Sequence, residues 1–246
     1  MRVAIYWAPE LDDPLHSAGS AWLGRDAETN AKVVQPALPG IAGLTADPRG
    51  YGLHATLRPP FRPATSYQAV IADLASLVTR IAPFDLPPLA VRDLDGFLAL
   101  TETAPCPALA SLAEAILRGT DRHRSAPDAD ELARRRRVGL SDRQEALLAR
   151  WGYPYVMEEW RFHVTLTRRL SADEHALVRP AAEAHFACIA GQKRRVEAVR
   201  VFTQAAPGAP FLIAERFALS GPARPPDLAG DGDDGRDASA GAAHRG

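Results

Sequence analysis

Short β-prone runs alternate with amphipathic helical patterns along most of this chain, and that alternation restricts the fold to sheets covered by helices. Residues 66–82 place their large apolar side chains on one helical face, behind a capping box at Thr65 and Gln68. Further helices are predicted around residues 109–117, 129–150 and 171–185, and strands at 3–7, 89–91, 96–100, 161–167, 196–203 and 211–219.

The order of these elements predicts a single α+β domain over residues 1–221 that consists of two similar lobes. Residues 1–125 and 151–221 both contain the order strand, helix, strand, strand, and residues 126–150 form a helical insertion between them. We therefore expect a bilobal, pseudo-symmetric fold with two antiparallel-rich sheets that line a central cleft, helices on the outside, and strands that can exchange between the lobes.

Composition separates a tail from the folded part and excludes some partners. Residues 222–246 consist mostly of Gly, Ala, Asp, Pro and Arg, which cannot bury enough surface to fold, so a disordered tail is predicted there. The 246-residue chain has 29 Lys and Arg against 30 Asp and Glu, a formal charge of -1. No overall field therefore attracts nucleic acid or anionic membrane, and a polyanionic ligand would need a local basic patch.

Cysteine use and hydropathy favour a cytoplasmic protein. Cys106 and Cys188 are far apart and fit neither a disulfide framework nor a metal-ligand spacing. Residues 1–9 carry one basic residue and no small-residue cleavage site, so they predict a first strand and no signal peptide. No apolar run approaches the roughly 18 residues that a membrane span needs, so no membrane partner is expected.

The chain contains two copies of one short motif. Residues 54–57 read His-Ala-Thr-Leu and residues 163–166 read His-Val-Thr-Leu, with the two histidines 109 residues apart. Side chains alternate along a strand, so each His shares a face with the Thr two residues later. One His on a strand is usually a hydrogen-bonded core residue. Two copies, one in each predicted lobe, favour a functional pair at one cleft.

This pattern resembles the repeated His-x-Thr signature of the 2H phosphoesterase superfamily. The wider strings AIYWAP at residues 4–9, PRGYGLHATLRPPF at 48–61 and WGYPYVMEEWRFH at 151–163 resemble the branch associated with bacterial phosphonate-degradation genes. The resemblance covers roughly residues 1–221. It implies the bilobal 2H fold and metal-free chemistry, without a cofactor, on a phosphodiester such as a 2′,3′- or 1,2-cyclic phosphate of a ribose.

The residue types suit that chemistry independently of the resemblance. Opening a cyclic phosphodiester needs a proton taken from water and a proton given to the leaving oxygen, and His, with an unperturbed pKa of about 6.5, can do either. His54 and His163 are therefore the predicted general acid and base. Thr56 and Thr165 are predicted to hold the phosphate through their hydroxyls. Because the motif is symmetric, the sequence does not assign the acid and the base.

Several arginines are candidate phosphate contacts. Strand alternation places Arg58 on the face of His54, and Arg161 on the face of His163, where a guanidinium can pair with a phosphate. The alternative for both is a strand end in solvent. The four consecutive arginines at residues 134–137 predict a solvated helix, with contact to a second phosphate as the minority hypothesis.

Tyrosines flank both motifs. Tyr51 and Tyr155 precede them in Gly- and Pro-rich segments that are typical of loops at a cleft rim. There they can stack on a base or bond a phosphate, and core packing is the alternative reading. Tyr6 on the first predicted strand carries the same two readings.

The leading prediction is a metal-independent cyclic phosphodiesterase that acts on a small phosphorylated ribose or nucleotide in phosphonate catabolism. A second reading gives the same site RNA ends with 2′,3′-cyclic phosphates, against which the near-neutral charge counts. A third reading is a protein of this fold that binds a phosphoester without turnover, against which both intact His/Thr pairs count. No metal is predicted, because no HExxH, HxH or carboxylate cluster adjoins either His.

Overall fold

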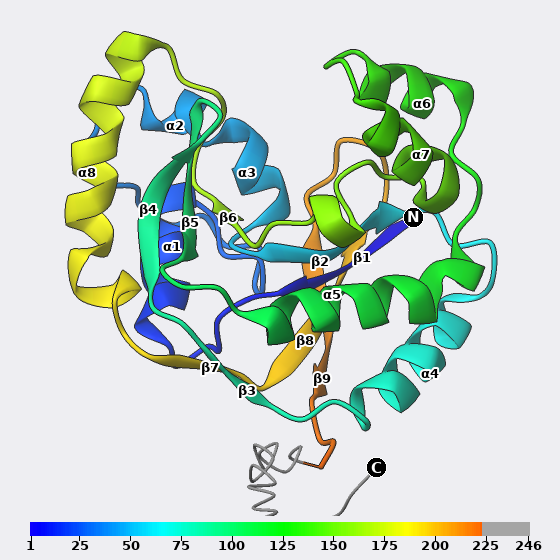
Figure 1. Cartoon of the computed structure of the whole chain (residues 1–246). Helices are drawn as coiled ribbons and strands as arrows, with labels where there is room; N and C mark the ends of the chain where they lie inside the picture. The colour runs from blue at the N-terminus through cyan, green and yellow to red at the C-terminus, as the bar shows by residue number, and fades with distance from the viewer. Residues whose placement is uncertain (223–246) are drawn as a thin grey trace, which may run out of the picture.

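The computed structural model describes residues 1–222, and in it helices flank a large antiparallel sheet (Figure 1). The predicted α+β class is confirmed. The predicted tail from residue 223 onward lies outside the described residues. The strands are β1 (Arg2–Trp7), β2 (Ala55–Phe61), β3 (Phe84–Leu86), β4 (Leu89–Leu94), β5 (Phe97–Glu102), β6 (Val164–Thr165), β7 (Arg194–Val196), β8 (Ala198–Gln204) and β9 (Leu212–Ala218). The helices are α1 (Pro14–Leu23), α2 (Ile41–Leu44), α3 (Ala46–Tyr51), α4 (Tyr67–Val78), α5 (Pro107–Thr120), α6 (Ala129–Arg136), α7 (Asp142–Trp151) and α8 (Ala172–Ala190).

Strands from the two halves of the chain are interleaved in one sheet. The large sheet has the order β4-β5-β6-β2-β1-β8-β9, and β3 and β7 form a separate pair. β4 and β5 from the first half thus lie on the side of β6, and β8 and β9 from the second half lie beside β1. The two strand groups expected as separate cleft-lining sheets are therefore joined, through the short contact between β2 and β6.

Local sequence signals set most helix boundaries. The capping boxes that begin at Ser141 and Ser171 are present at the starts of α7 and α8. Helix α4 is capped by Ser66, whose hydroxyl accepts from the Ala69 amide, and not by Thr65 as predicted. The predicted helix 129–150 is two helices, because Gly139 between them takes a left-handed φ of 72°. No described helix is both long and apolar enough to cross a membrane.

The side chains of β1 separate the two faces of the sheet. Val3, Ile5 and Trp7 belong to the main core beneath helices such as α4, α5 and α8, whereas Ala4 and Tyr6 belong to a smaller cluster on the other face. Figure 1 shows α4 and α5 below the sheet and α6 and α7 at the upper right. The face of β1 that carries Tyr6 is thus free of the main helical layer, and it forms one wall of the cleft described below.

Arg58 lies on the core face of β2 and not on the face of His54, because β2 contains a bulge. Thr56 is paired with Tyr6, but Arg58 is paired with Ile5, so Leu57 is an extra residue on β2. A bulge of this kind interrupts strict alternation, which is why the sequence-based placement of Arg58 in the cleft is wrong. Its side chain is 1% exposed, and its Nη2 lies 3.3 Å from the Asp121 carboxylate.

The pairing of Arg58 with Asp121 generates a stability prediction. Asp121→Ala leaves a buried guanidinium without its acid, so we expect a loss of about 3 kcal/mol or more in the free energy of unfolding. Arg58→Met removes the buried charge and keeps the volume, while Asp121 retains Arg124 at 3.0 Å, so we expect a loss below about 1.5 kcal/mol. Urea unfolding of both variants measures the difference. A larger loss of stability in Arg58→Met than in Asp121→Ala would contradict the placement of Arg58 in the core.

Candidate active site

The two His-x-Thr motifs meet at the contact between β2 and β6. Ala55 is paired with Val164, and both side chains are fully buried in the sheet. Their chain neighbours therefore point to the opposite face, which puts each motif's His and Thr in the cleft. In this antiparallel register, His54 lies across from Thr165 and His163 lies across from Thr56. The contact thus gathers four polar side chains from distant parts of the chain into one cluster.

All four side chains line one open cavity of about 630 Å³. Its other walls come from the cleft face of β1, from α3, from the loop after β6 and from α6 of the inserted segment. Besides the two motifs and these walls, β2, β5 and the segment after α7 contribute to the lining, which contains Arg2, Tyr6, Asp47, Pro48, Tyr51, Pro59, Pro60, Phe97, Arg134, Arg135, Tyr153, Thr167, Arg168 and Arg169. The helical insertion is therefore part of the cavity wall.

Each histidine is oriented by a hydrogen bond to the backbone carbonyl of the residue two positions before it. The His54 Nδ1 lies 2.9 Å from the carbonyl oxygen of Gly52, and the His163 Nδ1 lies 2.9 Å from the carbonyl oxygen of Arg161. A carbonyl only accepts, so Nδ1 carries the proton in both rings and Nε2 is the basic atom of each neutral imidazole. Each histidine can thus accept a proton at Nε2 when neutral, or donate one from Nε2 when charged.

The surroundings of the two rings favour the neutral form. The pKa of His54 is lowered to about 4, mainly by burial and to a smaller extent by the positive charge of a protonated His163, whereas the hydrogen bond to Gly52 acts in the opposite direction. The His54 ring stacks on Tyr6 at 4.0 Å between centroids, and on Tyr51 at 5.7 Å. Burial also lowers the pKa of His163, whose described aromatic neighbour is Phe97, edge-on at 6.0 Å.

These shifts generate a titration prediction. We expect the His54 ring of the free protein to titrate near pH 4, well below the usual 6.5. Because the folded-state pKa is the lower one, the unfolded state binds more protons, and the stability contributed by neutral His54 is lost as pH falls from about 6.5 to about 4. Histidine-selective NMR, with His54→Gln to assign the resonance, measures this pKa. An ordinary value of 6.5 would contradict the packing of this ring.

The cavity is positively charged although the chain is almost neutral. Five arginines line it, Arg2, Arg134, Arg135, Arg168 and Arg169, and Asp47 is the carboxylate among its lining residues. Arg168 is paired with Glu174 at 2.7 Å, and Arg135 with Glu131 at 2.6 Å. This is the local basic patch that an anionic ligand requires in a neutral chain. Within residues 1–222, no group of three or more His, Cys, Asp or Glu side chains is placed to hold a metal ion.

The structure brings together only some of the predicted substrate contacts. Tyr51 lines the cavity that holds both motifs and stacks on Phe211 at 5.1 Å. Tyr155 and Arg161 do not line it. They lie in an adjoining cavity of about 360 Å³ that shares Thr56, His163, Phe97, Tyr153 and Arg169 with the first. Arg161 precedes the two-residue strand β6, so the strand alternation used to place it does not extend that far.

Sequence reasoning missed the residues that come from other walls. Tyr153 lines both cavities and carries the Arg135 guanidinium over its ring at 4.6 Å, although the sequence analysis favoured Tyr155 from the same segment. Arg168 and Arg169 directly follow the second motif, and this pair of adjacent arginines was the available signal. Arg2 gave no sequence signal, because its place depends on the pairing of β1 with β2 and β8.

Two curated proteins that resemble this chain are both named ribose 1,5-bisphosphate phosphokinase PhnN. The protein from Janthinobacterium sp. (strain Marseille) is 39% identical over 231 residues, which cover 89% of this chain and 51% of the relative. The protein from Laribacter hongkongensis (strain HLHK9) is 40% identical over 219 residues, covering 87% of this chain and 50% of the relative. The chain thus spans about half the length of the curated relatives it matches.

Three solved structures can be aligned with most of this chain. The protein TT0787 of Thermus thermophilus is 19% identical with a TM-score of 0.46, over 90% of this chain and 99% of its own. E. coli LigT complexed with NADP+ is 16% identical with a TM-score of 0.42, over 89% and 97%. A phosphoesterase is 13% identical with a TM-score of 0.42, over 89% and 98%.

A family model matches the central part of the chain. The match covers residues 56–212, which include the whole second motif, the inserted helices and the Thr of the first motif. The model's description is "Protein of unknown function (DUF1045)". The matched region is well over half of the 246 residues. The chain therefore belongs to the DUF1045 family.

Proposed function

We propose that this protein is a metal-independent phosphoesterase that opens a cyclic phosphodiester of a small ribose compound. The observation that carries the proposal is the register of β2 with β6, which faces two neutral imidazoles and two hydroxyls into one cationic cavity. Both rings expose a basic Nε2, because both Nδ1 atoms are held by backbone carbonyls. Two such groups are what acid and base catalysis at one phosphorus needs.

The reaction we propose uses both histidines in one displacement. One neutral histidine takes a proton from water at Nε2 while the water oxygen attacks phosphorus. The bond from phosphorus to one ring oxygen of the cyclic phosphate breaks, and the other histidine, protonated, donates its Nε2 proton to that oxygen. Thr56 and Thr165 donate hydrogen bonds to the non-bridging phosphoryl oxygens, whose negative charge they stabilise. Proton exchange with solvent then restores both rings.

The ribose and the metabolic setting are supported by relatives. Two curated relatives carry the name of a kinase for a ribose bisphosphate, and they match this chain over about half of their own length. The cavity of this chain is open and lined by arginines, so it can take a phosphorylated ribose of the kind that the relatives' name mentions. The shared name of these relatives supports our proposal that the reaction belongs to phosphonate catabolism. We propose the cytoplasm as its location from the cysteine use of the sequence.

Substitution of either histidine tests the proposal. We expect His54→Ala and His163→Ala each to lower kcat by about 10²- to 10⁴-fold, the usual contribution of one general acid or base. Phosphorus NMR follows turnover in EDTA of ribose 1,2-cyclic phosphates, 2′,3′-cyclic nucleotides and a short RNA with a cyclic phosphate end. His175→Ala is the matched control, since His175 pairs with Asp93 at 2.8 Å and does not line the catalytic cavity.

The outcomes separate the readings. Turnover that each substitution lowers by about 10²-fold or more, and that EDTA leaves intact, supports the two-histidine mechanism. Turnover of the RNA alone would replace the small ribose compound by an RNA end. Tight binding of a cyclic phosphate by the folded protein, without any product, would contradict the proposal of an enzyme and favour a phosphoester-binding protein.

The pH dependence follows from the lowered pKa values. The reactive form has one neutral and one protonated histidine, and its population is highest between the two pKa values of the free protein. Because burial lowers both pKa values, we expect kcat/KM to reach its maximum below pH 6.5 and to fall as pH rises and the acid loses its proton. Initial rates at low substrate concentration across pH 4–9 measure this. A plateau that extends to pH 8 would contradict the assignment of a histidine as the acid.

A further inference from the structure

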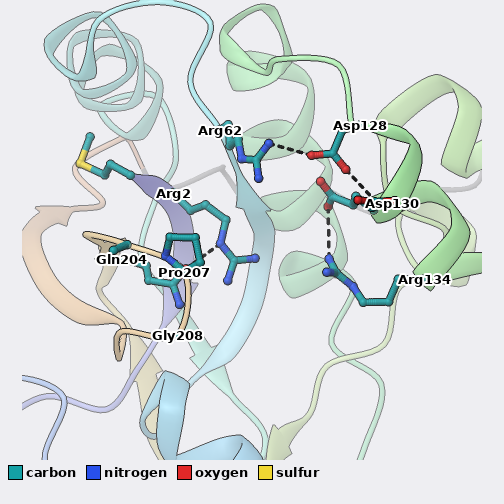
Figure 2. A pocket seen from close by; sticks show the side chains of 11 residues that line it. Arg2, Arg62, Asp128, Asp130, Arg134, Gln204, Pro207 and Gly208 are labelled. Carbon is teal, nitrogen blue, oxygen red and sulfur yellow. Dashed lines mark hydrogen bonds and ion pairs between the residues drawn. The ribbon is translucent and has the colours of Figure 1, made fainter.

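Arg2 is held in place at the opening between the catalytic cavity and a neighbouring one. The neighbouring cavity has a volume of about 380 Å³ and shares Arg2 and Arg134 with the first (Figure 2). The Arg2 Nε donates to the Gln204 side-chain oxygen at 2.7 Å, and Gln204, only 6% exposed, donates to the carbonyl of Ala209 at 2.7 Å. The Arg2 guanidinium is thus fixed by a buried amide before any ligand arrives.

The terminal nitrogens of Arg2 are not used by the described part of the protein. Within residues 1–222, no carboxylate pairs with Arg2, and its Nη1 and Nη2 donate no hydrogen bond. Two of the three acids that line the neighbouring cavity, Asp128 and Glu131, are paired with other arginines, and the third, Asp130, forms no ion pair with Arg2. Asp128 binds Arg62 at 2.8 Å, as Figure 2 shows, and Glu131 is shared by Arg134 and Arg135. The Arg2 guanidinium lies over the Phe211 ring at 5.3 Å, and no described carboxylate neutralises its charge.

The Tyr6 hydroxyl is a second uncommitted group on the same face of β1. It is buried, it has no hydrogen-bond partner among the described residues, and Tyr6 lines the catalytic cavity. A buried hydroxyl without a partner is unfavourable, and a ligand that accepts a hydrogen bond from it removes that cost. Burial raises the pKa of Tyr6 well above its usual value, so the hydroxyl stays protonated and remains a donor. The positive charge of Arg2 lowers this pKa by a smaller amount.

We propose that Arg2 and the Tyr6 hydroxyl form a second anion-binding subsite, and that the substrate is a phosphoester that carries a second phosphate group. The free edge of a fixed guanidinium pairs with two phosphate oxygens at once, and a phenol adds a third donor. The inference rests on the proposed function for the position of the first phosphate, near His54. Tyr6 links the two positions, because its ring stacks on the His54 ring.

The spacing of the two positions defines the substrate further. The first phosphate lies at His54 and Thr56, and Thr56 is paired with Tyr6 on β1, whereas Arg2 lies four residues before Tyr6 and also lines the neighbouring cavity. Because four residues of a strand span about 13 Å, the phosphate that Arg2 holds is on a different part of the substrate from the phosphate at His54. Within the proposed substrate class, this is a ribose cyclic phosphate with a further phosphate on its 5-oxygen.

A pair of substrates tests the subsite. We expect the wild-type kcat/KM for a ribose cyclic phosphate with a 5-phosphate to exceed that for the same compound without it by at least about 10-fold, as charged hydrogen bonds of this kind allow. Arg2→Gln and Tyr6→Phe should each lower this ratio about 10-fold, and Arg2→Lys should lower it less. The ratio cancels general damage to catalysis. Arg62→Gln, in the neighbouring cavity but paired with Asp128, should leave the ratio unchanged.

A binding measurement separates failure of the subsite from failure of the proposed reaction. Calorimetric titration compares adenosine 3′,5′-bisphosphate with adenosine 3′-monophosphate in the wild type and in Arg2→Gln. Tighter binding of the bisphosphate that Arg2→Gln removes supports the subsite even if no cyclic compound is turned over. Turnover with a wild-type ratio near one, or a ratio that Arg2→Gln does not lower, overturns the subsite and leaves the reaction standing.

Discussion

The single strand contact between Ala55 and Val164 determines the site. Because these two side chains point into the core on one face of the sheet, the His and Thr on either side of each point to the opposite face, and the antiparallel register places each His across from the other motif's Thr. Neither motif forms a site alone. The interleaving of strands from both halves of the chain has the consequence that segments 109 residues apart share one wall of one cavity.

The two faces of the sheet differ in what they contact. The core face packs against helices and contains the Arg58 side chain with its acid, whereas the cleft face holds His54 among aromatic rings that keep it neutral. The inserted helix α6 and the loop after β6 add arginines to a chain without net positive charge. Orientation of Nε2, partial burial and local positive charge together suit proton transfer at an anionic phosphoester.

The sequence predicted the elements that have local signals. The two capping boxes at Ser141 and Ser171, the amphipathic pattern of α4 and the repeated motif were sufficient for the α+β class and for the four central side chains. It failed where a distant partner decides the geometry. The bulge that turns Arg58 away from the cleft arises from the pairing of β1 with β2, and the two-residue length of β6 leaves Arg161 outside the alternation. Arg2 joins the cavity only through strand pairing.

The central claim is that both histidines face one phosphate group, and histidine NMR with a phosphate ligand tests it most directly. Adenosine 3′-monophosphate added to the wild-type protein should raise the pKa of His54 and of His163 together, because one phosphate charge favours the protonated form of both rings. His175, which pairs with Asp93 outside the cavity, should not respond. A ligand that binds and raises the pKa of only one of the two, His54 or His163, would contradict the account.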